Sequence, residues 1–150
     1  MLFRSLRDWV LGTTPLISTT TNPAEAAGSY SPYISGDARF ITFASRATTL
    51  IPGEIPLETD NDADIFVYDR VGPVTSRVSV NFFGDYAANG DSYSPSITSD
   101  GRFIAFASDA NNLDVHLPDL NARRDIYVTD RTLGLSGVFD FGLTQRVSLS

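Results

Sequence analysis

The residues whose types could do chemistry are aspartates at alternate positions ahead of a predicted strand. Asp60, Asp62 and Asp64 occupy every second position of one stretch. Carboxylates spaced in this way can converge on one hard cation where the backbone curls, as they do in Ca²⁺-binding loops. An EF-hand is excluded, because Ile65 stands at the sixth position and Val71 at the twelfth. The stretch predicts a Ca²⁺ site of another geometry, with Asx turns and strand-start contacts as the alternative.

A second stretch repeats this arrangement with one change. Asp119, Asn121 and Asp125 correspond to the first set, but Arg123 stands where the first has Asp62. A guanidinium beside a cation disfavours metal binding. Structural contacts are therefore the stronger alternative for this second set, and Ca²⁺ is the only cofactor that the sequence suggests.

The sequence offers little for covalent or acid–base catalysis. His116 is the only histidine, and there is no cysteine. A Ser–His–Asp assembly would have to use this one imidazole, and the Gly-x-Ser-x-Gly stretch of α/β-hydrolases does not occur. We therefore expect no catalytic residue and no enzyme activity in this chain.

Charge and hydropathy limit the class of partner. The net charge is −7, and every basic residue is arginine. Nucleic-acid backbones and anionic membranes both attract clustered positive charge, and no apolar run is long enough to span a bilayer. Nucleic acids and membrane surfaces are therefore not expected as partners. Four phenylalanines in predicted connections would contact a partner or a neighbouring structural unit: Phe82, Phe83, Phe139 and Phe141.

The sequence contains a long internal repeat. The stretch SYSPYISGDARFITFAS of residues 29–45 returns as SYSPSITSDGRFIAFAS at residues 92–108. Downstream, DIFVYDR at 64–70 returns as DIYVTDR at 125–131. A repeat of this length indicates one supersecondary unit used more than once.

Each repeat predicts four short strands, from its Phe- and Ile-rich segments and the turn residues between them. Asp100-Gly101 predicts a tight hairpin turn, whereas Gly36-Asp37-Ala38 in the first repeat predicts a turn of another type. The predicted strands cover residues 33–35, 39–44, 64–69 and 76–80, and then 96–98, 102–107, 125–130 and 146–149.

The repeated pattern resembles a known family. Ser-Pro-x-Ile, Asp-Gly-Arg-Phe-Ile-Ala-Phe, Asp-Ile-Phe-Val-Tyr-Asp-Arg and Arg-Val-Ser, in this order, are similar to the TolB-type (WD-like) β-propeller repeat over residues 16–150. The resemblance implies an all-β fold of two four-stranded antiparallel blades, preceded by the outer strand of another blade. The expected division is a leader or short helix at 1–15, that outer strand and linker at 16–28, the first blade at 29–81, and a linker with the second blade at 82–150.

Two blades do not close a propeller, which needs ~4–8. The sequence therefore predicts either a partial propeller from a longer polypeptide or copies that assemble into a ring, and an open two-blade domain is the remaining alternative. The resemblance also implies a periplasmic or secreted protein, although no clear signal peptide is visible.

Two classes of function follow from the resemblance. The first is a non-catalytic binding or scaffold module that displays loops to a protein, peptide or glycan. The second is the accessory propeller of a larger hydrolase, such as a peptidase of the prolyl-oligopeptidase type. Fold-level likeness alone is compatible with both.

Overall fold

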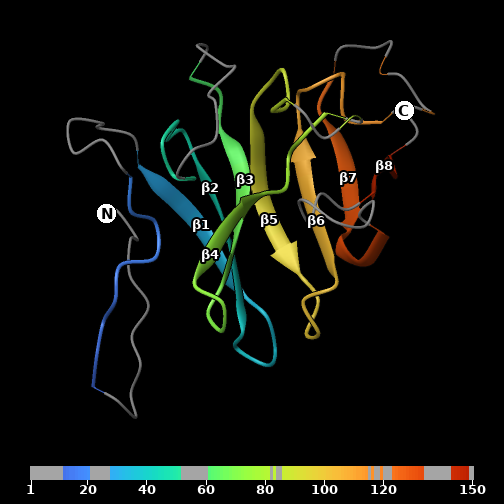
Figure 1. The fold of residues 1–150 in the computed structure, drawn as a ribbon. Helices are drawn as coiled ribbons and strands as arrows, with labels where there is room; N and C mark the ends of the chain where they lie inside the picture. Colours follow the sequence, from blue (N-terminus) through green and yellow to red (C-terminus); the bar gives the residue numbers. More distant parts are fainter. Residues whose placement is uncertain are drawn as a thin grey trace.

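The computed structural model describes residues 12–20, 28–51, 61–81, 83, 86–114, 116, 119, 123–133 and 143–148. These residues form two four-stranded antiparallel sheets that stand beside each other (Figure 1). The described ranges contain one 3-10 turn, Arg131–Leu133, and no α-helix. Within them, no helix is long and apolar enough to cross a membrane. The all-β prediction of two four-stranded blades is confirmed.

Each sheet follows the order of its strands in the chain, with β1 and β5 at one edge and β4 and β8 at the other. The first sheet consists of β1 (Ser29–Ile34), β2 (Phe40–Ser45), β3 (Asp64–Asp69) and β4 (Val74–Arg77). The second consists of β5 (Ser92–Ile97), β6 (Phe103–Ser108), β7 (Asp125–Asp130) and β8 (Leu143–Arg146). The two central pairs have the same register, because Phe43 pairs with Phe66 and Phe106 with Tyr127.

The edge strands β1 and β5 begin four residues earlier than predicted. Each contains a register shift between its tyrosine and the residue after its proline. Ser31 and Ser94 take left-handed backbone angles there, with φ of 51° and 49°. Such a bulge lets a strand continue past a proline, which cannot donate a ladder hydrogen bond. The Ser-Pro pairs therefore lie within these strands.

The turn that joins β1 to β2 has the same form as the turn that joins β5 to β6, contrary to the prediction. The Gly101 amide donates to the carbonyl of Thr98, and the Ala38 amide donates to that of Ser35 in the same way. The last residue of each turn has a left-handed backbone conformation, with φ of 57° at Ala38 and 74° at Gly101. The first repeat thus keeps the turn although alanine is poorly suited to this conformation.

The outer strands β4 and β8 lie two or three residues earlier than predicted. The prediction assigned the Arg-Val-Ser triplet to these strands, but each strand ends at the arginine, Arg77 or Arg146. The following valine amides still donate to β3 and β7 carbonyls. The serines are used for side-chain contacts described below. Farther upstream, residues 12–20 contribute no strand to either sheet.

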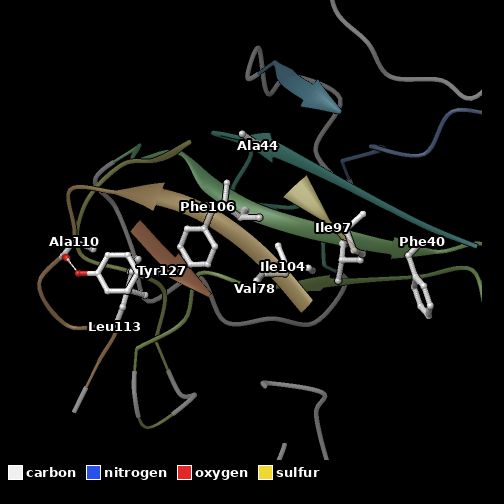
Figure 2. Close-up of a cluster of buried hydrophobic side chains, with 12 residues drawn as sticks. Phe40, Ala44, Val78, Ile97, Ile104, Phe106, Ala110, Leu113 and Tyr127 are labelled. Carbon is white, nitrogen blue, oxygen red and sulfur yellow. Dashed lines mark hydrogen bonds between the residues drawn. The ribbon is translucent and has the colours of Figure 1, made fainter. Parts of the chain in front are cut away.

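The main hydrophobic core lies between the two sheets. One face of the first sheet contributes Phe40, Ala44, Ile65 and Val67, and the facing side of the second contributes Ile104, Phe106 and Tyr127. Figure 2 shows these side chains with Ala110 and Leu113, whose loop closes one end of the cluster. Phe106 and Tyr127 stack at 6.0 Å between ring centroids, and the Tyr127 hydroxyl donates to the Ala110 carbonyl. The second repeat therefore covers the first.

Candidate functional site

The long connections of both repeats leave from the same end of the sheets. Neighbouring strands are antiparallel, so the ends of β2, β4 and β6 and the starts of β3, β5 and β7 lie together there (Figure 1). We call this the long-loop end; its described loop residues are 46–51, 61–63, 78–81, 83, 86–91, 109–114, 116, 119, 123 and 124. Connecting segments on a rigid sheet scaffold are where binding residues concentrate. The long-loop end is therefore the candidate functional site.

Asp91 joins the two sheets at this end. Its Oδ2 accepts a hydrogen bond from Arg46 Nη2 at 2.7 Å, and its Oδ1 accepts the Ala63 amide at 2.6 Å. The Ser92 amide donates in return to the Ala63 carbonyl. Arg46 also donates to the carbonyl of Asn61. Residues before and after the first long loop are thus fixed to the start of the second sheet.

Tyr93 extends this junction into the second sheet. Its hydroxyl lies 2.8 Å from Asp91 Oδ2 and 3.2 Å from Asp109 Oδ2. Asp109 in turn accepts a bidentate pair of hydrogen bonds from Arg124, at 3.0 Å each. The Arg124 guanidinium stacks on the Tyr93 ring, 4.1 Å from its centroid. The result is one continuous row: Arg46, Asp91, Tyr93, Asp109 and Arg124. We call it the seam row.

Contacts within the seam row shift its pKa values. Burial opposes ionisation of Asp91, but hydrogen bonds from Ala63, Arg46 and Tyr93 outweigh it and lower the pKa of that carboxyl. The hydrogen bonds from Arg124 lower the pKa of Asp109. Burial, followed by its hydrogen bonds to these carboxylates, raises the pKa of Tyr93 to about 12. At neutral pH the row holds two guanidinium ions, two carboxylates and a neutral phenol.

The row is accessible although its members are paired. The side chains of Arg46 and Arg124 are 42% and 54% exposed, and that of Asp109 is 39% exposed. Surface ion pairs of this kind contribute little to stability, about 0–1 kcal/mol each. The exposed guanidinium groups of Arg46 and Arg124 can therefore be shared with a partner at small cost.

Asparagines fix the neighbouring connection. Asn89 donates from Nδ2 to Asn111 Oδ1 at 2.7 Å, and the Asn111 amide donates to Asn89 Oδ1. The Asn89 amide donates to Asn112 Oδ1. The connection between the sheets and the second long loop are thus held together beside the seam row, and they present a preformed surface.

The predicted metal ligand Asp64 is used structurally. Ser79 donates from Oγ to Asp64 Oδ1 at 2.7 Å, and Arg77 Nη1 lies 3.5 Å from Asp64 Oδ2. The Ile65 amide donates to the same serine oxygen. The three side chains are buried. This Asp–Arg–Ser clasp fastens the end of β4 to the start of β3.

The second repeat builds the same clasp around the predicted ligand Asp125. Arg146 Nη1 donates to Asp125 Oδ2 at 2.9 Å and lies 3.6 Å from Asp119 Oδ1. Ser148 donates to Asp125 Oδ1, and the Ile126 amide donates to Ser148. The structure therefore brings Asp119 and Asp125 together around a guanidinium.

The remaining predicted ligands are distributed as follows. Asp62 lies half-buried just before β3, while Asp60 and Asn121 fall outside the described residues. Among the residues that are described, no three His, Asp or Glu side chains are grouped as metal ligands would be. The Ca²⁺ site at 60–64 stays a prediction.

The predicted partner-binding aromatics are only partly described. Phe83 is 74% exposed, and Phe82, Phe139 and Phe141 fall outside the described residues. His116 is exposed, and its backbone amide donates to Asp114 Oδ1. The structure thus gives Phe83 the accessibility that a partner contact requires, and the role itself stays a prediction.

The sequence-based prediction did not identify the seam row. A signal was present in the differences between the repeats. Asp91 stands where the first repeat has Gly28, and Asp109 stands where it has Arg46. At the two ends of otherwise near-identical stretches, these charge substitutions mark the place where the two units meet.

Comparison with known proteins identifies the fold and nothing finer. No family model and no curated protein matches the sequence. Among solved structures, the chain is similar to one described as the crystal structure of the tricorn protease, with a TM-score of 0.58 and 16% sequence identity. The match covers 97% of this chain and 15% of that one. Two repeated antiparallel blades and this likeness together show a β-propeller-like fold.

Proposed function

We propose that this chain is a non-catalytic propeller module of the TolB-like repeat type that binds a protein or peptide through its long-loop end. The observation that carries the proposal is the seam row. It crosses from one sheet to the other, its arginines are half-exposed, and an aromatic ring lies between its carboxylates. Arginine and tyrosine are, with tryptophan, the side chains most enriched where protein interfaces concentrate their binding energy.

The chemistry of the row favours a polar, extended ligand. Arg124 keeps one guanidinium face on Tyr93, while more than half of its side chain is accessible. A planar guanidinium can take a carboxylate or a backbone carbonyl from a partner by bidentate hydrogen bonds. Since Asp91 and Asp109 offset the two arginines, the row recognises hydrogen-bonding pattern more than net charge.

A second function is supported by a specific observation. The fold likeness is to a protease of which this chain spans 15%, so an accessory propeller of a larger peptidase has the same structural support. In that case the long-loop end would guide peptides toward a catalytic domain. Both versions require peptide binding, and they differ in whether hydrolysis accompanies it.

Selection from a random peptide library displayed on phage tests the proposal. The wild-type chain is immobilised, and affinities of enriched peptides are measured by fluorescence anisotropy. We expect Arg124→Ala to weaken binding at least about tenfold, because a partly desolvated charged hydrogen bond contributes ~1.5–3 kcal/mol. Arg70→Ala is the matched control at the opposite end of the sheets, where Arg70 donates to the Ala38 carbonyl. The affinity of this variant for the peptide should stay within about twofold of that of the wild-type chain.

Four outcomes of this experiment would decide against the proposal or modify it. Absence of any enriched peptide, or enriched peptides that bind both variants equally, contradicts it. If peptides fail but a glycan array gives binding that Arg124→Ala abolishes, the site stands and the ligand class changes. Turnover of fluorogenic peptides by the purified chain, lost in His116→Ala, would contradict the non-catalytic part.

A further inference from the structure

A pair of neighbouring residues at the long-loop end is chemically reactive. Asn89 is the only asparagine in the sequence that glycine follows. The backbone nitrogen after an asparagine can attack the side-chain amide carbon, and glycine favours this reaction because no Cβ limits its backbone or shields its nitrogen. Asparagine is accordingly among the thermolabile residues of proteins. The pair formed by Asn89 and Gly90 is therefore a candidate site of covalent modification.

The glycine of this pair is required by packing. A Cβ added at Gly90 would stand 3.0 Å from the backbone nitrogen of Ala110 and 3.0 Å from the carbonyl carbon of Asp109. The same two segments are joined by the Asp109 amide, which donates to the Asp91 carbonyl. Glycine lets the connection between the sheets and the second long loop approach this closely. The fold thus favours glycine after Asn89, although it makes the asparagine reactive.

The side chain of Asn89 is held by the second long loop. Its Nδ2 donates to Asn111 Oδ1 at 2.7 Å, and its Oδ1 accepts the Asn111 amide at 3.0 Å. Both polar atoms of the side-chain amide are thus engaged, although Asn89 is exposed to water. Cyclisation requires this side chain to rotate until its amide carbon meets the Gly90 nitrogen in line, and the two hydrogen bonds restrict that rotation. The contacts with Asn111 should therefore slow the reaction in the folded chain.

We propose that Asn89 is a site of spontaneous deamidation whose rate is controlled by Asn111. The Gly90 backbone nitrogen gives its proton to hydroxide and forms a bond to Asn89 Cγ. The bond from Cγ to Nδ2 breaks, and Nδ2 leaves as ammonia with a proton taken from water. One water molecule then opens the five-membered imide at either carbonyl carbon, which yields aspartate or isoaspartate. The net reaction consumes one water and releases one ammonia, with no change of oxidation state.

Both products change the junction that Asn89 makes. Either one adds a negative charge two residues before Asp91 of the seam row. In the isoaspartate, the main chain also runs through the former side-chain carbon, so the backbone before Gly90 becomes one methylene longer. That extra length falls where Gly90 lies close to the backbone at 109–110. Deamidation should therefore loosen the connection from the second long loop, whether or not the long-loop end binds a partner.

Mass spectrometry of the full chain after incubation in mildly alkaline buffer tests the proposal. The mass increase of the peptide that contains Asn89, located by fragmentation, gives the rate in the folded chain and in guanidinium chloride. We expect the unfolded chain to react at least about tenfold faster, because two hydrogen bonds of ordinary net strength no longer restrain the side chain. Equal rates, or no conversion at Asn89 in the unfolded chain, would overturn the proposal.

Two substitutions of Asn111 separate its hydrogen bond from its other effects. Asn111→Ala removes the Oδ1 acceptor and should raise the rate in the folded chain about fivefold. Asn111→Asp keeps an oxygen that accepts from Asn89 Nδ2, so its rate should stay within about twofold of that of the wild-type chain. In guanidinium chloride all three chains should react alike. An unchanged rate in Asn111→Ala, or equal acceleration in both variants, would contradict control by Asn111.

The effect on the long-loop end is measured on the product itself. Anion exchange separates converted from unconverted chains, because the converted chains carry one more negative charge. We expect the converted chains to unfold at a lower temperature and to exchange the amides of 109–114 faster, with unchanged exchange in the turns at 35–39 and 98–102. Equal exchange of both forms in 109–114 would overturn the proposed loosening of the loop.

Discussion

The turn glycine of the second sheet, Gly101, lies directly against the ring of Phe40 in the first sheet. A Cβ added at Gly101 would stand 2.1 Å from Phe40 Cδ2. The same ring is covered by the guanidinium of Arg131, 4.2 Å from its centroid, and Arg131 donates to the Gly101 carbonyl. The Asp-Gly turn therefore has two functions: it reverses the chain between β5 and β6 and lets the second repeat close over the first.

The Phe40–Gly101 contact predicts a large effect of Gly101→Ala. The added methyl group would clash with the Phe40 ring, and alanine would be strained at the φ of 74° of this position. Together these should lower the free energy of unfolding by about 2–4 kcal/mol, measured by urea denaturation. Gly72→Ala is the matched control, because nothing lies within 4 Å of its added Cβ. Equal stability of the two variants would show that the sheets do not approach as described.

At the equivalent turn of the first repeat, we expect a substitution to change the free energy of unfolding in the opposite direction. Ala38 has φ of 57°, where alanine is disfavoured and glycine is not. Ala38→Gly should therefore raise the free energy of unfolding by about 0.5–1 kcal/mol, after allowance for the greater freedom of glycine in the unfolded chain. The midpoint of thermal unfolding should rise accordingly. A lowered midpoint would contradict the left-handed assignment at Ala38.

The two clasps predict that buried and exposed aspartates differ in their effect on stability. Asp125→Asn removes the charge that faces Arg146, whose side chain is only 12% exposed. We expect a loss of about 2–4 kcal/mol, since a buried guanidinium is left undercompensated. Asp69→Asn breaks a pair in which Arg39 is 46% exposed and should cost about 1 kcal/mol or less. Comparable losses in chemical denaturation would argue against the clasp.

Two tyrosines predict a loss of stability at alkaline pH. Burial, then the nearby Asp125 carboxylate, raises the pKa of Tyr127 to about 12, and the pKa of Tyr93 is also about 12. A folded pKa above the unfolded value of ~10 means that the stabilisation is complete below pH ~10 and is lost as the pH rises toward 12. Tyr127→Phe should flatten the stability profile between pH 10 and 12. An unchanged slope would show that the phenol is not buried in solution.

The repeat made most of the fold predictable. The central strands of both sheets were predicted to within one residue, because their Phe and Ile residues recur with the same spacing in the two repeats. The bounds of the edge strands were harder to predict. The Ser-Pro bulges keep β1 and β5 extended through a proline, and the arginines that end β4 and β8 look the same in sequence whether they continue a strand or turn toward a carboxylate.

The site was less predictable, because its residues join parts of the chain that lie far apart. Arg46 and Asp91 are separated by 45 residues, and each belongs to a stretch that reads as an ordinary loop. Alternating aspartates likewise suggest cation ligands, yet Asp64 and Asp125 meet arginines that follow 13 and 21 residues later in the chain. Pairing of this kind depends on the way the strands meet.

Binding of a partner at the long-loop end is tested most directly by hydrogen–deuterium exchange of the chain with a peptide enriched by selection. We expect added protection of amides in 46–51, 86–93 and 109–114, and unchanged exchange in the turns at 35–39 and 98–102. Protection confined to those turns, or to the strands β6 and β7, would contradict binding at this end.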